Sequence, residues 1–264
     1  MSIATVLREK WARDETVFGV WAALPCAFAA ELLCVPGVDY VCIDQQHGLV
    51  DYPQMLAMMR AIEGRGTVPL TRVPAGEAWL IGKALDAGAQ GVVVPMVSNR
   101  AEAAAAVAAC RYFPEGRRSY GPVRASMVME SRDLAVLGGQ VLCFVMVETR
   151  EGVERVDEIA STPGLDGIYI GPADLALGLG LPPDLDKDEP EHVAAVERIL
   201  AACRRNAIVP GIQCGSGKSA FRFAERGFRF VTFTKDSSLL PLAVATEIAA
   251  ARAGGAAAVR KGYA

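Results

Sequence analysis

Residues 40–72 read YVCIDQQHGLVDYPQMLAMMRAIEGRGTVPLTR, and this stretch contains one complete unit of the predicted fold. A short apolar run at Tyr40–Asp44 predicts a strand, a helical segment follows at Tyr52–Glu63, and a second apolar run follows at Val68–Arg72. Strands that are apolar along their whole length are typical of parallel strands covered on both faces. The stretch therefore predicts a strand–helix–strand unit of a parallel α/β fold.

The same alternation recurs along nearly the whole chain. Further strands are predicted at residues 17–23, 91–95, 141–148, 167–171, 208–213 and 228–234. Further helices are predicted up to residue 31, at 77–87, 100–112, 152–161, from 173, at 189–206, 218–226 and from 238, with an irregular loop at 113–124. Eight strand–helix units in about 240 residues predict a (β/α)8 barrel of the α/β class, with a doubly wound open sheet as the alternative. We expect one domain over residues 1–264.

Composition narrows the class of protein. Hydrophobic residues make up 52% of the chain and charged residues 22%, a composition that excludes a disordered chain. The net charge of −3 shows no excess of basic residues of the kind that binds nucleic acid. The segment Phe18–Val38 carries Glu31 as its only charge, but Pro25 and Pro36 interrupt it, so we expect no membrane span. The first sixteen residues lack the apolar core of a signal peptide.

The cysteines indicate a reducing compartment. The chain has seven, an odd number, and no pair has the C-x-x-C spacing of a zinc or redox site. Most lie in apolar segments, where a free thiol packs as a small hydrophobic group. We therefore expect a cytoplasmic protein without disulfides.

Polar side chains gather at the carboxyl ends of the predicted strands, where barrel enzymes carry their active sites. They are Asp44, His47, Arg72, Glu148, Asp174, Lys235 and Asp236. Glu148 and Asp174 follow adjacent strands, so their carboxylates are candidate ligands of one hard divalent cation. The alternative for each is a helix N-cap.

The other candidates each have a structural alternative. His47 follows a buried strand and is a candidate general base, or a structural loop residue. Arg72 suits a carboxylate or enolate oxygen, or else an ion pair with Asp86. Lys235 is a candidate Schiff-base lysine, whereas His192 lies in a charged helix start and is expected on the solvated surface.

With these residues in place, the chain resembles the HpcH/HpaI aldolase family, the metal-dependent pyruvate aldolases of aromatic and sugar-acid catabolism. The similarity extends roughly from Gly19 to Leu240. The motifs that carry it are Gly19-Val-Trp, Asp39-Tyr-Val-Cys-Ile-Asp-Gln-Gln-His-Gly, Val68-Pro-Leu-Thr-Arg-Val-Pro, Asp86-Ala-Gly-Ala-Gln-Gly, Val94-Pro-Met, Val147-Glu-Thr and Gly171-Pro-Ala-Asp-Leu. The resemblance implies a barrel of the phosphoenolpyruvate/pyruvate-domain type.

The resemblance also implies a reaction, the reversible cleavage of a 4-hydroxy-2-oxo acid to pyruvate and an aldehyde. Glu148 and Asp174 would hold Mg²⁺, Mn²⁺ or Co²⁺, with no organic cofactor. Arg72 would stabilise the pyruvate enolate, and His47, oriented by Asp86 or Asp44, would handle the proton of the aldol hydroxyl. The expected substrate-binding residues are Trp21, Arg72, Gly171, Ala173, Asp174 and Gln213. The partners implied are small molecules and further copies of the chain, in a homohexamer with C-terminal helices exchanged between neighbours.

Two departures from the family pattern leave the substrate open. Met146 stands where members usually have Gln, and Gln46 where they commonly have Glu. Both changes remove polarity or charge near the metal and the base. The alternatives are therefore an oxaloacetate-decarboxylating synthase that forms a carbon–carbon bond, an acyl-CoA lyase of the same superfamily, and a barrel without catalytic activity.

Overall fold

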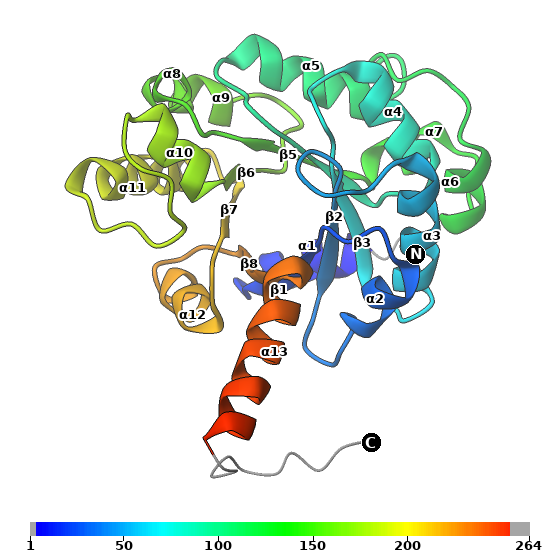
Figure 1. The fold of residues 1–264 in the computed structure, drawn as a ribbon. Helices are drawn as coiled ribbons and strands as arrows, with labels where there is room; N and C mark the ends of the chain where they lie inside the picture. Colours follow the sequence, from blue (N-terminus) through cyan, green and yellow to red (C-terminus); the bar gives the residue numbers. More distant parts are fainter. Residues whose placement is uncertain (1–3, 254–264) are drawn as a thin grey trace.

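The computed structural model describes residues 4–253, and within them eight parallel strands form a closed barrel. The strands are β1 (Val17–Ala22), β2 (Tyr40–Asp44), β3 (Val68–Arg72), β4 (Gly91–Val94), β5 (Leu142–Met146), β6 (Gly167–Ile170), β7 (Val209–Gln213) and β8 (Phe230–Lys235). Neighbours in sequence pair in order, and β8 closes the ring on β1 (Figure 1). The predicted (β/α)8 barrel is confirmed, and the open sheet is wrong.

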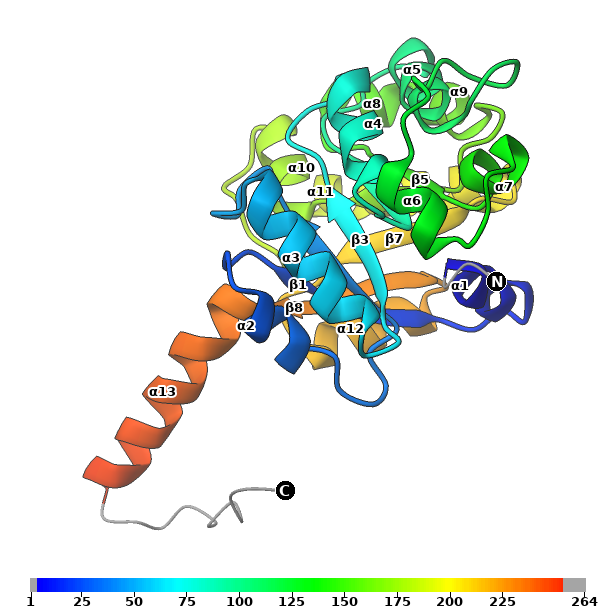
Figure 2. The ribbon, with the colours of Figure 1, turned by 90° about the vertical axis from the view of Figure 1, so that its right-hand side faces the viewer.

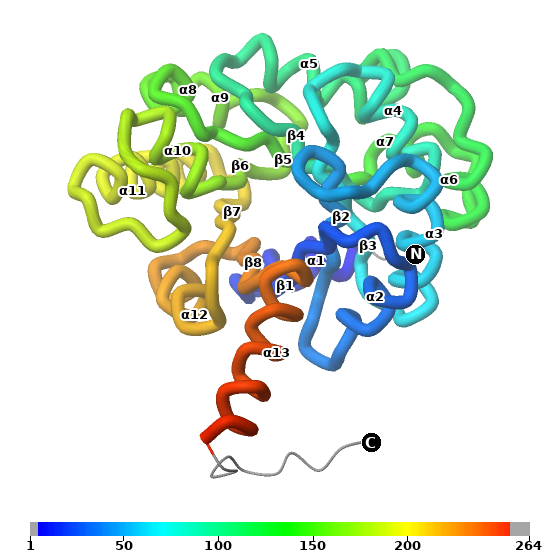
Figure 3. The backbone as a smooth tube through the Cα atoms, viewed as in Figure 1, coloured from blue at the N-terminus to red at the C-terminus, as the bar shows by residue number. Residues whose placement is uncertain are grey.

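The helices that lie between the strands in sequence form the outer ring of the barrel (Figures 1 and 3). The helices of the described chain are α1 (Ala4–Ala12), α2 (Ala27–Leu32), α3 (Tyr52–Glu63), α4 (Ala78–Asp86), α5 (Arg100–Cys110), α6 (Val123–Val128), α7 (Leu134–Gly139), α8 (Arg150–Glu154), α9 (Val156–Ala160), α10 (Pro172–Gly178), α11 (Pro190–Arg205), α12 (Gly217–Glu225) and α13 (Asp236–Arg252). Of the helices in the described chain, none has both the length and the apolar character that crossing a membrane requires. Residues 1–3 and 254–264 of the predicted domain lie outside the described residues.

The structure differs from the prediction at several helices. α1 was not predicted, and neither was α7; α6 begins inside the segment predicted as an irregular loop. The helix predicted at residues 152–161 is two short helices, because Arg155 departs from helical geometry with φ −101° and ψ 16°. The last helix begins two residues earlier than predicted, at Asp236. Each of these segments is short or weakly periodic, so its sequence pattern carries little signal.

Aromatic side chains fill the barrel interior below the carboxyl ends of the strands. The rings of Phe144 and Phe230 stack with their centroids 4.5 Å apart, and Tyr40 lies 4.3 Å from Phe230. Glycine on the neighbouring strands makes room for them. A Cβ on Gly19 would lie 2.4 Å from the Tyr40 ring, and one on Gly167 would lie 2.3 Å from Phe144. The interior is therefore a packed core, and open space begins only at the rim.

Helix α1 closes the opposite end of the barrel (Figure 2). Leu7 is fully buried in the interior cluster with Val17, Tyr40 and Val68. Trp11 of the same helix packs edge-on against Phe144 and Phe230, with ring centroids 5.8 and 6.1 Å apart. The amino-terminal helix thus seals the floor of the barrel and leaves the carboxyl-terminal rim as its open end.

Because α1 closes the end of the barrel, we expect substitutions at two neighbouring residues of this helix to change the free energy of unfolding by different amounts. Leu7→Ala should lower the free energy of unfolding by about 3 kcal/mol, because a buried leucine loses its contacts and leaves a cavity. Val6→Ala should change it by less than about 0.5 kcal/mol, because Val6 is 48% exposed. Urea denaturation of both variants measures the two values, and equal losses would contradict the role assigned to α1.

Candidate active site

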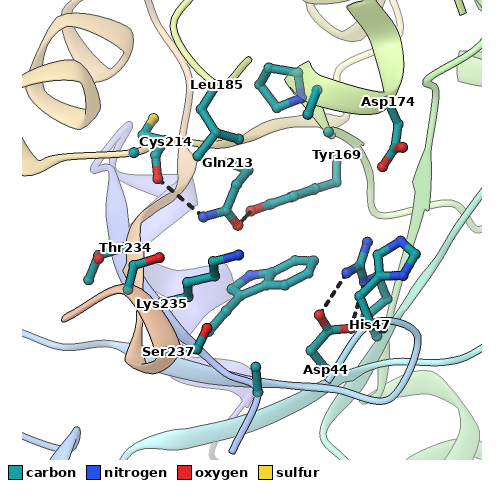
Figure 4. A pocket seen from close by; sticks show the side chains of 18 of the residues that line it. Asp44, His47, Tyr169, Asp174, Leu185, Gln213, Cys214, Thr234, Lys235 and Ser237 are labelled. Carbon is teal, nitrogen blue, oxygen red and sulfur yellow. Dashed lines mark hydrogen bonds and ion pairs between the residues drawn. The ribbon is translucent and has the colours of Figure 1, made fainter. Parts of the chain in front are cut away.

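A pocket with a volume of about 240 Å³ opens at the carboxyl ends of the strands (Figure 4). Residues from every strand except β4, and from the segments that follow the strands, line it. They are Trp21, Ala23, Asp44, His47, Arg72, Met146, Tyr169, Gly171, Pro172, Ala173, Asp174, Leu185, Gln213, Cys214, Gly215, Thr234, Lys235, Ser237 and Ser238. The pocket lies where the barrel fold predicts an active site.

A buried ion pair joins the ends of β2 and β3 at the wall of the pocket. Asp44 accepts from Arg72 through both oxygens, with Nε–Oδ1 at 2.9 Å and Nη2–Oδ2 at 2.7 Å. The same Oδ1 accepts from the backbone N–H groups of Gln46 and His47. Asp44 therefore fixes both the guanidinium and the loop that carries His47. The alternative pairing of Arg72 with Asp86 is wrong.

From Arg72, a row of contacts crosses the mouth of the barrel to β7. The guanidinium lies 4.5 Å from the centre of the Trp21 ring, which stacks on Tyr169 with centroids 5.5 Å apart. The Tyr169 hydroxyl donates to Gln213 Oε1 at 3.0 Å and is 2.7 Å from Thr232 Oγ1. The Arg72 guanidinium, the rings of Trp21 and Tyr169 and the Gln213 amide each contact the next group in this row. The predicted site residues Trp21, Arg72 and Gln213 are therefore linked by contacts, with Tyr169 between Trp21 and Gln213.

Glu148 follows β5 and is 1% exposed. Its Oε1 accepts from the backbone N–H of Met96 at 2.9 Å, whereas its Oε2 is buried without a partner in the described chain. A Cβ on Gly171 would lie 2.6 Å from that Oε2 and 2.9 Å from Cε of Met146, so only a glycine fits beside the oxygen at this position. Burial raises the pKa of Glu148 to about 7, and nearby Asp174 adds to the rise.

Asp174 lies in the first turn of α10, facing the pocket. The predicted alternative of helix capping is wrong for both carboxylates, because the N-cap residues of α8 and α10 are Thr149 and Gly171. A partnerless buried carboxylate oxygen beside a second carboxylate fits a hard divalent cation. Residues 4–253 hold no group of three or more His, Cys, Asp or Glu arranged for a metal, so these two carboxylates would need water or substrate oxygens beside them.

His192 of α11 contacts the backbone at the start of α10, the helix that carries Asp174. It is 3% exposed, and its Nε2 lies 3.1 Å from the carbonyl oxygen of Pro172, the first residue of α10. Burial lowers the pKa of its imidazole. The expectation of a solvated surface histidine is wrong, because α11 packs this face of its first turn against α10 in spite of the charged residues around it.

His47 lies exposed at the pocket rim, between Asp44 and Asp174 (Figure 4). Its ring makes no hydrogen bond within the described residues. Asp44 contacts its backbone rather than its imidazole. Asp86 is elsewhere: it accepts from Arg118 Nη2 at 2.6 Å and lines a separate pocket beside α4. Neither predicted orienting acid therefore holds the His47 ring within this chain.

The structure brings most predicted site residues to one pocket. Trp21, Asp44, His47, Arg72, Gly171, Ala173, Asp174 and Gln213 line it, and Glu148 lies behind Gly171. Met146, which the sequence analysis placed near the metal, also lines the pocket. The lining residues that sequence reasoning missed are Ala23, Tyr169, Pro172, Leu185, Cys214, Gly215, Thr234, Ser237 and Ser238. Tyr169 could have been found, because it precedes the predicted site residue Gly171 by two positions and alternate side chains of a strand face the same side.

Comparisons with known proteins agree with this geometry. The sequence profile of the HpcH/HpaI aldolase/citrate lyase family matches residues 17–241. The chain is 40% identical over 247 residues to a hydroxypyruvate/pyruvate aldolase of Rhizorhabdus wittichii, covering 94% of this chain and 98% of that one. It is 36% identical to a 4-hydroxy-2-oxo-heptane-1,7-dioate aldolase of Shigella flexneri, covering 89% and 88%.

A solved structure of a family protein from Burkholderia cenocepacia J2315 superposes with a TM-score of 0.87 at 34% identity, covering 95% of this chain and 98% of that one. The relatives named as aldolases show that this barrel is an enzyme of the lyase class. The chain belongs to the HpcH/HpaI aldolase/citrate lyase family, as the motifs indicated, and it is an aldolase.

The raised pKa of Glu148 predicts a pH-dependent cost to stability. At a pH above about 7, the pKa in the folded protein, the carboxylate is charged in both the folded and the unfolded chain. Folding then removes a charge from water, which lowers the stability of the folded protein. Below the ordinary value of 4.5 it is neutral in both states and the cost vanishes. In chelator-treated protein, Glu148→Gln should therefore gain stability over wild type by about 3 kcal/mol as the pH rises from 4 to 8.

Urea denaturation at each pH measures this difference. Glu151→Gln, at an exposed position of α8, serves as the control and should follow the wild type at every pH. A difference between Glu148→Gln and wild type that stays constant from pH 4 to 8 would contradict the assigned shift.

Proposed function

We propose that this aldolase depends on a divalent metal and cleaves a 4-hydroxy-2-oxo acid reversibly to pyruvate and an aldehyde. The observation that carries the proposal is the buried, partnerless Oε2 of Glu148 near Asp174, against which the chain places a glycine, Gly171. Relatives named as pyruvate and 4-hydroxy-2-oxo acid aldolases support the reaction class.

Glu148 and Asp174 would hold the metal, which is Mg²⁺, Mn²⁺ or Co²⁺ in this proposal. When bound, such an ion supplies Lewis-acid polarisation of the keto oxygen of the substrate. Glu148 contributes through its free Oε2, because its other oxygen is held by Met96. No organic cofactor enters the proposal.

Arg72 stabilises the negative charge that develops on the pyruvate oxygen as the enolate forms. Its Nε and Nη2 are occupied by Asp44, which leaves Nη1 without a hydrogen bond in the described chain. Asp44 and the Trp21 ring fix the guanidinium before substrate arrives. A positioned donor of this kind acts without reorganising during the reaction.

His47 exchanges the proton of the aldol hydroxyl, directly or through water. Its ring is exposed at the rim and faces the same pocket as Arg72 and Asp174. Gly171, Ala173 and Asp174 lie at the start of α10, where backbone N–H groups without helical partners receive the substrate carboxylate. Trp21 lines the side on which the aldehyde binds.

Deuterium exchange of the pyruvate methyl group, followed by NMR, tests the proposal at its first chemical step. We expect exchange with Mn²⁺ or Mg²⁺, and a loss of at least about 100-fold on adding EDTA or in Glu148→Gln, because the enolate then loses its main stabilising charge. Glu151→Gln removes a carboxylate from the exposed surface and should exchange at the wild-type rate.

The other outcomes point to the alternatives. Exchange that survives EDTA would overturn the metal proposal and favour a Schiff base, for which Lys235 is the pocket lysine. Absence of exchange under every condition would overturn pyruvate as the substrate and direct attention to oxaloacetate or acyl-CoA.

We also propose that the enzyme is cytoplasmic and forms a homohexamer in which α13 is exchanged between subunits. Helix α13 projects away from the barrel (Figures 1 and 2) and exposes Leu240, Leu242, Val244 and Ile248. Apolar side chains in one exposed segment are typical of a surface that another chain covers.

Replacing two of these side chains tests the assembly. Leu242→Glu combined with Val244→Glu should shift the particle mass from hexamer toward monomer, because each charge would have to be buried in the interface. Light scattering after size-exclusion chromatography measures the mass. A wild-type protein that elutes as a monomer would contradict the proposal.

A further inference from the structure

Lys235 is a cation in the pocket that the proposed chemistry does not use. It is the last residue of β8, pairs in register with Trp21 of β1, and is exposed at the pocket wall. Its ammonium group makes no ion pair or hydrogen bond within residues 4–253. Figure 4 shows it beside Thr234 and Ser237, across the pocket from Asp174 and His47.

Asp236, next to Lys235 in the chain, and Asp44 of the same pocket are engaged elsewhere, and Asp174 lies on the opposite side of the pocket (Figure 4). Asp236 is 4% exposed, and its oxygens accept from the backbone N–H groups of Ala23, Leu24 and Ser237. Asp44 is held through both oxygens by Arg72. Lys235 therefore presents an uncompensated positive charge to the pocket.

Neutral hydrogen-bonding groups surround this charge. Thr234, Ser237 and Ser238 also line the pocket, the first two on the side of Lys235 (Figure 4), and the three hydroxyl groups make no hydrogen bond within the described chain. An ammonium with three rotatable donors next to free hydroxyl donors is suited to an anionic oxygen group. Gln213 is different, because its amide oxygen is taken by Tyr169 and its nitrogen donates to the carbonyl of Cys214.

We propose that Lys235, assisted by Ser237 and Ser238, binds an anionic group at the far end of the acceptor aldehyde. This inference rests on the proposed function, which puts the oxo-acid end of the substrate at Glu148 and Asp174. With that end bound across the pocket, the charge of Lys235 selects substrates that carry a second anion. The group is a carboxylate or a phosphate, and both offer the oxygens that an ammonium binds.

Initial rates of aldol addition to pyruvate test this preference. Two matched aldehyde pairs supply the comparison: succinic semialdehyde against pentanal, and glyceraldehyde 3-phosphate against glyceraldehyde. The wild-type enzyme should prefer the anionic member of at least one pair in kcat/KM, and the pair that shows the preference identifies carboxylate or phosphate.

Three variants assign the preference to Lys235. Lys235→Met should lower the anionic-to-neutral ratio by about 10- to 100-fold, the range expected for a hydrogen bond to a charged group. Lys235→Arg keeps the charge and should retain most of the ratio. Lys218→Met removes the same charge from the exposed face of α12, outside the pocket, and should leave the ratio within about twofold of wild type.

A binding measurement separates this inference from the proposed reaction. Titration calorimetry with succinate and with butyrate compares a dianion and a monoanion of the same length, and inorganic phosphate serves as a third probe. Lys235→Met should weaken succinate or phosphate at least tenfold while changing butyrate little. If pyruvate exchange fails but this result holds, the anion site stands and the proposed function falls.

Three results would overturn the inference. These are a wild-type enzyme that prefers neither anionic aldehyde, a ratio that is unchanged in Lys235→Met, and succinate and phosphate binding that are both insensitive to that substitution. Borohydride trapping of pyruvate on Lys235 would likewise overturn it, because the nitrogen would then be a nucleophile rather than an anion-binding group.

Discussion

The buried pair between Asp44 and Arg72 is the interaction on which the rim depends. Removing two charges from water costs several kcal/mol per ion, and only good geometry with further hydrogen bonds offsets that cost. Here the pair is bidentate, and Asp44 accepts two backbone N–H groups in addition. This network of hydrogen bonds orients the His47 loop and the Arg72 guanidinium. Through the contact of Arg72 with Trp21 it also orients the row of side chains across the mouth of the barrel.

The fold could be predicted because its signal repeats. Each strand is a short apolar run followed by a helix, so the pattern identifies the barrel even where single boundaries shift by a residue or two. Helix α1 lacks that support, because it precedes the first strand and buries Leu7 and Trp11 against residues distant in sequence. Contacts of this kind are set by closure of the barrel and leave no local periodicity.

The site could be predicted as far as the strand ends determine it. Asp44, Arg72 and Gln213 end their strands, so the barrel alone brings them together. Asp86 and His192 behave differently because both lie on outer helices, where packing decides the partner. Asp86 meets Arg118 from the segment before α6, and His192 meets the backbone of α10. A charged sequence context described the surroundings of His192 correctly and its burial wrongly.

Two energetically unfavourable features involve the carboxylate of Glu148: the backbone strain at Met96 and the burial of an oxygen without a partner. Met96 has φ +59°, a left-handed conformation that costs a residue with a Cβ on the order of 1 kcal/mol, and its N–H donates to Glu148 Oε1. The other oxygen is buried without a partner, and burial raises the pKa of the group. Protein stability would be better served by a hydrophobic residue here. Strain that holds one oxygen while leaving the other without a partner is explained if the second oxygen binds a ligand, as the proposed metal site requires.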